Sequence, residues 1–109
     1  MKTIFKQTSN ITAVDKFNMK MCKSLQTAVG KSLTVTKAAI CEDADKDGEV
    51  VQTACIITDE GAYGTISATA MDLVDSLIDM LEEIGEPITV RVEARKTQNN
   101  REYLVLVIE

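Results

Sequence analysis

The sequence of 109 residues predicts one small domain of mixed α+β class, mainly β with two helices. Two segments, beginning near Thr12 and Thr69, place apolar residues at helical spacing behind a capping residue. Between and after them, stretches rich in β-branched residues are separated by turn-forming Asp, Asn and Gly. Hydrophobic residues make up 45% of the chain and aromatic residues only 4%, so the core must be aliphatic.

The first helix is expected between Thr12 and Gly30. Thr12 and Asp15 have the spacing of a capping box, and Gly30 supplies a C-terminal stop. The apolar residues at helical spacing are Val14, Phe17, Met21, Leu25 and Ala28. The lysines on the opposite side are Lys16, Lys20 and Lys23. We therefore expect an amphipathic, basic helix whose apolar side is buried.

Three strands are expected to follow as a meander. They cover Leu33 to Cys41, Val50 to Ile57 and Ala62 to Ser67. Their turns are Asp43 to Gly48, which contains Lys46, and Asp59 to Gly61. The first two strands are almost entirely apolar, as expected of strands that are covered on both faces.

The second helix is expected to begin at Thr69, with Asp72 as its capping-box partner, and to end at Gly85 before Pro87. Its apolar side comprises Leu73, Leu77, Ile78, Leu81 and Ile84. Its acidic side comprises Asp72, Asp75, Asp79, Glu82 and Glu83.

A hairpin closes the sequence. Residues 88–95 alternate between apolar and polar, Thr97 to Asn100 form a polar turn, and Tyr103 to Ile108 are wholly apolar. From the meander onward, three strands, a helix and two strands follow the order of the five-stranded, partly open OB barrel.

This order predicts a single OB-like domain over residues 1–109. Residues 1–30 would be an N-terminal extension and helix, and residues 31–109 the barrel. The added helix would pack outside the barrel. A split α+β sandwich fits the same order of elements and stays an alternative.

The net charge of −5 is unevenly distributed. Residues 1–37 hold seven lysines and one acid, residues 38–90 one lysine and thirteen acids, and residues 91–109 four cations and three acids. Such segregation can leave a basic face on an acidic protein, although solvated surface charge accounts for it equally well.

Several function classes are disfavoured. The chain has no histidine, no phosphate-binding glycine loop and no nucleophile elbow, so we expect no enzymatic activity and no cofactor. Cys22, Cys41 and Cys55 lack metal-site spacing and read as small buried hydrophobes in a reducing compartment. No stretch is long and apolar enough for a membrane span, and a cytoplasmic protein is expected.

The acidic turn imitates a calcium loop. Asp43, Asp45, Asp47 and Gly48 copy the opening of an EF-hand, but the twelfth position, which needs a bidentate acid, is Ala54. Turn chemistry explains these residues, and we expect no metal site.

The candidate binding residues lie mainly around the last hairpin. The expected phosphate-binding cations are Lys37, Arg91, Arg95, Lys96 and Arg101. Tyr63, between Gly61 and Gly64, is expected to offer an open ring for base stacking, and Tyr103 is the second candidate. The alternative is that Tyr103 belongs to the core and that the arginines are ordinary surface charges.

The chain also resembles a known family. The stretches that carry the resemblance are Asp47 to Val51, Ile56 to Gly61, Gly64 to Thr69, Arg95 to Thr97 and Arg101 to Leu104. Over roughly residues 30–109, it is similar to the small single-stranded DNA-binding proteins of phages and mobile elements of Gram-positive bacteria. The resemblance implies an OB-like fold, sequence-indifferent binding and aromatic residues that stack bases.

The function expected from the sequence is non-catalytic, sequence-indifferent binding of single-stranded DNA, or of RNA, in phage or mobile-element replication. The alternative is a protein-interaction or regulatory module that uses the acidic helix 69–85 to contact a replication or host protein. A subunit of a homo-oligomer is a third hypothesis. No membrane partner is expected.

Overall fold

The structure, a computed structural model, describes residues 3–44 and 47–109. Asp45 and Lys46, in the middle of the expected acidic turn, lie outside the described residues. In chain order, the elements are β1 (Thr3–Gln7), α1 (Ala13–Lys20), β2 (Lys23–Ser24), the 3-10 helix η1 (Leu25–Ala28), β3 (Ser32–Ala44), β4 (Val50–Thr58), β5 (Gly61–Thr65), α2 (Ala68–Ile84), β6 (Ile88–Lys96) and β7 (Glu102–Ile108).

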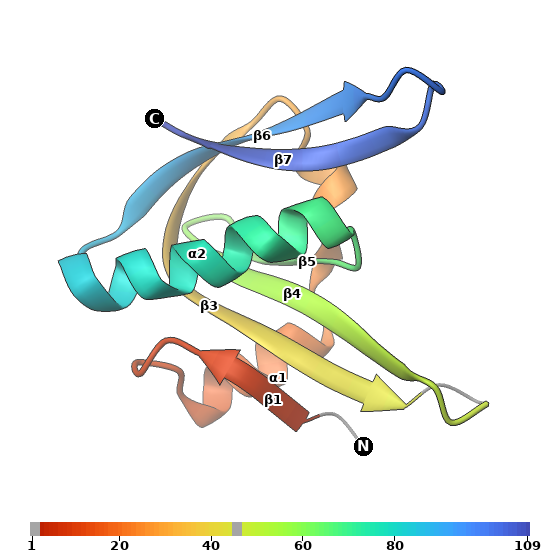
Figure 1. The fold of residues 1–109 in the computed structure, drawn as a ribbon. Coiled ribbons are helices and arrows are strands. Elements are labelled where there is room, and N and C mark those ends of the chain that lie inside the picture. The colour runs from red at the N-terminus through yellow and green to blue at the C-terminus, as the bar shows by residue number, and fades with distance from the viewer. Residues whose placement is uncertain (1–2, 45–46) are drawn as a thin grey trace.

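The described strands form one curled sheet in the order β2-β5-β4-β3-β6-β7, with β1 paired to β3 (Figure 1). The 13 residues of β3 serve two neighbours in succession: Ser32 to Val35 pair with β6, and Ala39 to Glu42 pair with β1. The meander and the hairpin are therefore present as expected. Within the described residues, the edge strands β2 and β7 share no ladder, so the sheet is a half-barrel with an open edge.

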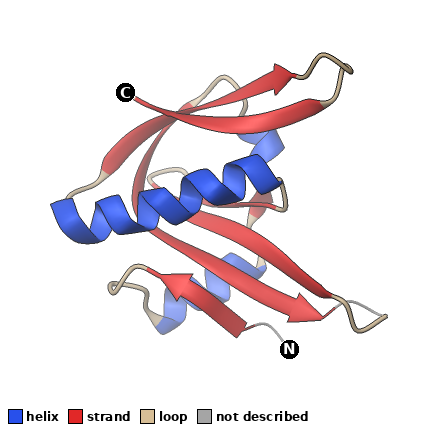
Figure 2. Ribbon diagram, viewed as in Figure 1, coloured by secondary structure: helices blue, strands red, loops and turns tan. Residues whose placement is uncertain are grey.

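Helix α2 crosses the concave side of this sheet, between the β6–β7 hairpin and the β3–β4 pair (Figure 2). The side chains that α2 buries in the inner core are Ala70, Val74, Leu77, Ile78 and Leu81. They pack against apolar residues of β3, β4, β6 and β7, which gives the mixed α+β, barrel-like architecture.

Both ends of α2 follow local chemistry. The C-terminal end at Gly85 is confirmed: its φ of 74° is the left-handed conformation that glycine adopts freely. The helix begins at Ala68, one residue before the expected start, but the expected cap at Thr69 is wrong, because Ser67 Oγ accepts the hydrogen bond from the Ala70 backbone N–H. Ile84, expected in the core, is exposed in the last turn.

A second apolar cluster lies on the outer face of the sheet. Ala39 and Cys41 of β3 and Cys55 of β4 are buried there beneath Met19 of α1. The central strands are therefore covered on both faces, as their continuous apolar sequences predicted. Cys41 and Cys55 are buried, and Cys22 is half-buried.

Helix α1 differs most from expectation. The capping box of Thr12 and Asp15 is present, but the helix ends at Lys20. Lys23 and Ser24 then pair in parallel with Tyr63 and Gly64, so sheet pairing replaces the rest of the expected helix. Strands β1 and β2 were not predicted, since short edge segments carry little periodicity.

The expected apolar side of α1 is also reversed. Val14, Phe17 and Met21 are exposed, whereas Asp15 and Met19 are buried. Met19 fills the outer cluster, and Leu25 enters the inner core after the chain has left the helix. Of the five apolar residues that a single helix was expected to bury, only Leu25 and Ala28 enter a core.

Candidate nucleic-acid interface

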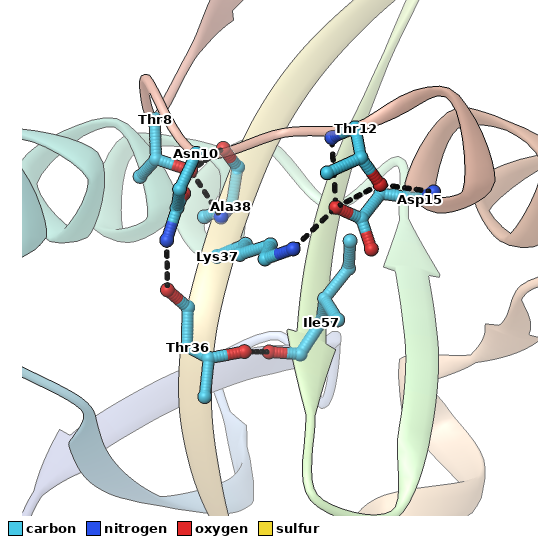
Figure 3. Close-up of polar contacts among 8 residues, drawn as sticks. All are labelled: Thr8, Asn10, Thr12, Asp15, Thr36, Lys37, Ala38 and Ile57. Carbon is cyan, nitrogen blue, oxygen red and sulfur yellow. Dashed lines mark hydrogen bonds and ion pairs between the residues drawn. The ribbon is translucent and has the colours of Figure 1, made fainter.

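The segment that carries α1 is fixed to β3 by a polar network (Figure 3). The Thr8 backbone N–H donates to the Ala38 carbonyl at 3.0 Å, and the Ala38 N–H donates back to Thr8 Oγ1 at 3.3 Å. Asn10 Nδ2 donates to the Thr36 carbonyl at 3.3 Å. These bonds hold the start of α1 against the outer face of the sheet.

A partly buried ion pair completes the attachment. Lys37 Nζ lies 2.5 Å from Asp15 Oδ2, and Thr12 donates to the same oxygen from its backbone N–H at 2.8 Å (Figure 3). Burial favours a higher pKa for Asp15, but the hydrogen bonds from Lys37 and Thr12 outweigh it and lower the pKa of this carboxyl.

This ion pair corrects one expected binding residue. Lys37 lies beneath α1, and its ammonium is neutralised by Asp15. A lysine held in this way positions the helix and is not available to a phosphate.

Tyr63 is corrected as well. It pairs with Ile56 across the β4–β5 ladder, and its side chain lies in the inner core with only 3% of its surface exposed. The glycines beside it do not open the ring to solvent, because the ring points into the inner core. Gly64 faces the other side of the sheet, where a Cβ would be 2.7 Å from Cys22 Sγ. Tyr63 therefore offers no face for base stacking.

The hairpin cations divide into two groups. Arg91 lies 3.7 Å from Glu109 and 4.0 Å from Glu93, and Arg95 lies 3.2 Å from Glu93. Lys96 and Arg101, next to the turn, are exposed and form no ion pair with any described residue. The free positive charge of the hairpin is thus concentrated near the turn between β6 and β7.

Tyr103 lies beside these cations. In the β6–β7 ladder, Arg95 is opposite Tyr103 and Lys96 is opposite Glu102, so each pair shares a face of the hairpin. From the sequence, Tyr103 was expected either to be exposed for base stacking or to belong to the core. Its side chain is half-buried, so it fits neither alternative fully.

A groove of about 510 Å³ runs along the open edge of the half-barrel, between β2 and β5 on one side and the start of β7 on the other. Its lining includes the hydroxyls of Ser24, Thr53, Thr65 and Ser67, the Tyr103 side chain and Lys23. Gln26 Nε2 donates to Glu102 Oε1 at 3.2 Å, so the acid that lines the groove is hydrogen-bonded.

The structure therefore brings Arg95 and Tyr103 together on one face of the hairpin, places Lys96 opposite Glu102 on the other, and leaves Arg91 four residues away along β6. Arg101 directly precedes β7, next to the turn. Lys23, which lines the groove, was placed by the sequence only on a basic helix side and was not recognised as part of this site. Its lysine-rich neighbourhood was the available signal. The missing information was the strand β2 that brings Lys23 to the groove.

The acidic side of α2 is partly covered by the N-terminal segment. Lys6 Nζ lies 2.6 Å from Asp75 and 2.9 Å from Asp79, and these hydrogen bonds raise the pKa of Lys6. Glu82 accepts hydrogen bonds from the backbone N–H and the hydroxyl of Ser9. Three of the five acids expected to form a contact face for a partner therefore bind the chain's own residues.

Among residues 3–44 and 47–109, no cluster of three or more Cys, Asp or Glu side chains is arranged to hold a metal. Neither described α-helix has the length and apolar character of a membrane span. No protein-family model, curated protein or solved structure matches the chain.

Proposed function

We propose that this chain binds single-stranded DNA without sequence preference, through the open edge and last hairpin of an OB-type half-barrel. The groove at the open edge is the observation that carries the proposal. Tyr103 and Lys23 line this groove, and the hairpin turn beside it carries Lys96 and Arg101, which form no ion pair with a described residue. Aromatic rings beside a basic track are the features that bind single strands irrespective of sequence.

The path of the strands supports the OB assignment. The meander β3-β4-β5, the helix α2 and the hairpin β6-β7 follow in the order of an OB barrel, and β3 joins the two halves. OB folds bind ligands on the face of their second and third strands and at two loops, one of which joins the last two strands. That loop corresponds to the turn between β6 and β7.

One difference from the usual OB arrangement shifts the proposed interface away from the sheet face. The second and third barrel strands would be β4 and β5, and α1 packs on the outside of both. A nucleic acid therefore cannot lie directly on that sheet face while α1 stays in place. The open edge and the hairpin turn are the parts of the barrel surface that stay accessible.

The proposed role is the protection of single strands exposed during replication of a phage or mobile element. It needs no catalytic group, and contacts to phosphates and base faces carry no sequence information. DNA and RNA share these features, so oligo-U is a necessary second ligand in any binding test.

The test is a titration of labelled oligo-dT, and in parallel of oligo-U, with wild type and two alanine variants, at salt concentrations from about 50 to about 200 mM. Arg101→Ala is expected to weaken binding and to make the plot of log affinity against log salt shallower by about 0.7, the contribution of one phosphate contact. Arg91→Ala is the matched control, because its guanidinium is already engaged with Glu93 and Glu109.

The proposal fails if wild type leaves oligo-dT unbound at about 50 mM salt, where electrostatic binding is strong. An equal loss in Arg91→Ala and Arg101→Ala would also contradict it, because the hairpin turn would then have no special part. In the first case, the interaction module based on the acidic helix α2 becomes the preferred function.

A further inference from the structure

We propose that α1 is part of the nucleic-acid interface, with Phe17 stacking a base and Lys16 and Lys20 holding phosphates. This inference rests on the proposed function and extends it. Helix α1 covers the sheet face that an OB barrel would use, and its own outer face would replace that surface.

The first argument is the exposure of the aromatic residues. Tyr63 is buried and Tyr103 is half-buried, whereas 60% of Phe17 and 63% of Phe5 are exposed to solvent. Contact of a phenyl ring with water is unfavourable, and stacking against a base would remove part of the ring from water and stabilise the complex. The two phenylalanines are therefore the rings most open to a ligand.

The two phenylalanine rings differ in the charged residues around them. Phe5 shares one surface depression with Asp72 and Asp75 of α2, where phosphates would be repelled. It shares a second depression with Lys16 and with Lys6, whose ammonium is already paired with the acids of α2. Phe17 has Lys16 beside it in the chain and Lys20 one turn further on. Neither lysine forms an ion pair with a described residue, and the one acid of α1, Asp15, is engaged by Lys37.

The orientation of Phe17 follows from helix geometry. It is two residues from both Asp15 and Met19, the buried residues of α1, and is therefore about half a turn away from each. The ring points away from the sheet. The Asp15–Lys37 ion pair and the Met19 packing hold the helix in this orientation, so the ring is presented on a fixed element.

The chain connects this helix directly to the groove. Helix α1 ends at Lys20, and Cys22 and Lys23 already line the groove at the open edge. A single strand that passes Tyr103 and Lys23 would therefore meet Lys20 and then Phe17. The hairpin turn, the groove and α1 would form one continuous track.

The experiment measures oligo-dT affinity for wild type, Phe17→Ala and the matched control Phe5→Ala, whose rings have nearly equal exposure. Phe17→Ala is expected to weaken binding about 5- to 150-fold and to leave the salt slope unchanged, as for the loss of one stacked base. Phe5→Ala is expected to bind like wild type. The double variant of Lys16 and Lys20 to alanine is expected to make the salt slope shallower by about 1.4.

A second control tests whether the effect belongs to the ring. Val14→Ala removes another exposed apolar side chain of α1 and is expected to leave affinity unchanged. Equal losses in Val14→Ala and Phe17→Ala would indicate an apolar protein contact and would overturn the stacking assignment. The same holds if Phe17→Ala changes only self-association, measured by sedimentation, and not oligo-dT affinity.

The two proposals can fail separately. If Phe17→Ala binds like wild type while Arg101→Ala is weakened, α1 is outside the interface and the proposed function stands. If wild type itself does not bind oligo-dT, both proposals fall. Because Phe17 is exposed, its alanine variant is expected to unfold at the wild-type temperature, which separates lost binding from lost folding.

Discussion

The two helices of this protein differ in what they bury and what they expose. Helix α2 buries Leu77, Ile78 and other aliphatic side chains in the concave face of the sheet and presents most of its acids to the outside. Helix α1 buries Asp15 together with Met19, and exposes Val14 and Phe17. Their outer surfaces also carry opposite charge.

This difference indicates that the two helices have different roles. Burial of apolar area stabilises α2 and, with it, the half-barrel. Helix α1 is held by hydrogen bonds to β3, one ion pair and the packing of Met19, so its exposed apolar and basic residues are not needed for its own attachment. We infer that α2 serves the fold and that α1 serves binding.

The largest expected effect comes from the core of α2. Leu77→Ala should lower the free energy of unfolding by about 2–5 kcal/mol, because it leaves a cavity among buried aliphatic side chains. Phe17→Ala on α1 should change the same quantity by less than about 0.5 kcal/mol. Urea denaturation measures both, and similar losses would contradict the contrast between the helices.

A smaller effect is expected at the attachment of α1. Asp15→Asn keeps an oxygen that can accept from the Thr12 N–H but removes the charge that faces Lys37. We expect a loss of about 2 kcal/mol at neutral pH, the usual size for a hydrogen bond to a charged group. Asp72→Asn, an exposed acid of α2 without a hydrogen bond to a described residue, should change stability by less than about 0.5 kcal/mol.

The stabilisation by the Asp15 carboxylate is expected to depend on pH. The pKa of Asp15 is lower in the folded protein than in the unfolded chain, so its stabilisation is present above the ordinary value and is lost as pH falls. The difference between wild type and Asp15→Asn should therefore shrink below about pH 4. A difference that stays constant from neutral to acid pH would show that the ion pair contributes nothing.

The regular parts of the fold were predictable from the sequence. The apolar runs of β3 and β4, the periodicity of α2 and its Gly85 stop each act through local pattern, and the structure follows them. The end of α1 was not predictable in this way. Helical spacing continues past Lys20, but the pairing of Lys23 with β5 and the separate burial of Leu25 interrupt the helix.

In the candidate site, too, some features follow from local sequence and others depend on tertiary contacts. The proximity of the hairpin cations and Tyr103 was predictable because they are close along the chain and across one turn. Tyr63 and Lys37 were misassigned because their environments depend on residues far away in the sequence, Ile56 and Asp15 among them. Phe17 was assigned to the core by periodicity, whereas the tertiary contacts of Asp15 and Met19 turn the opposite side of α1 toward the sheet.

The most direct test of this account is the map of backbone amide shifts in the isotope-labelled protein when oligo-dT is added at about 50 mM salt. We predict that the shifts concentrate in three places: the turn between Lys96 and Arg101, the strand Lys23–Ser24, and α1. The amides of α2 should change little. Shifts centred on α2, with α1 and the hairpin turn unchanged, would contradict the assignment of binding to α1 and of structure to α2.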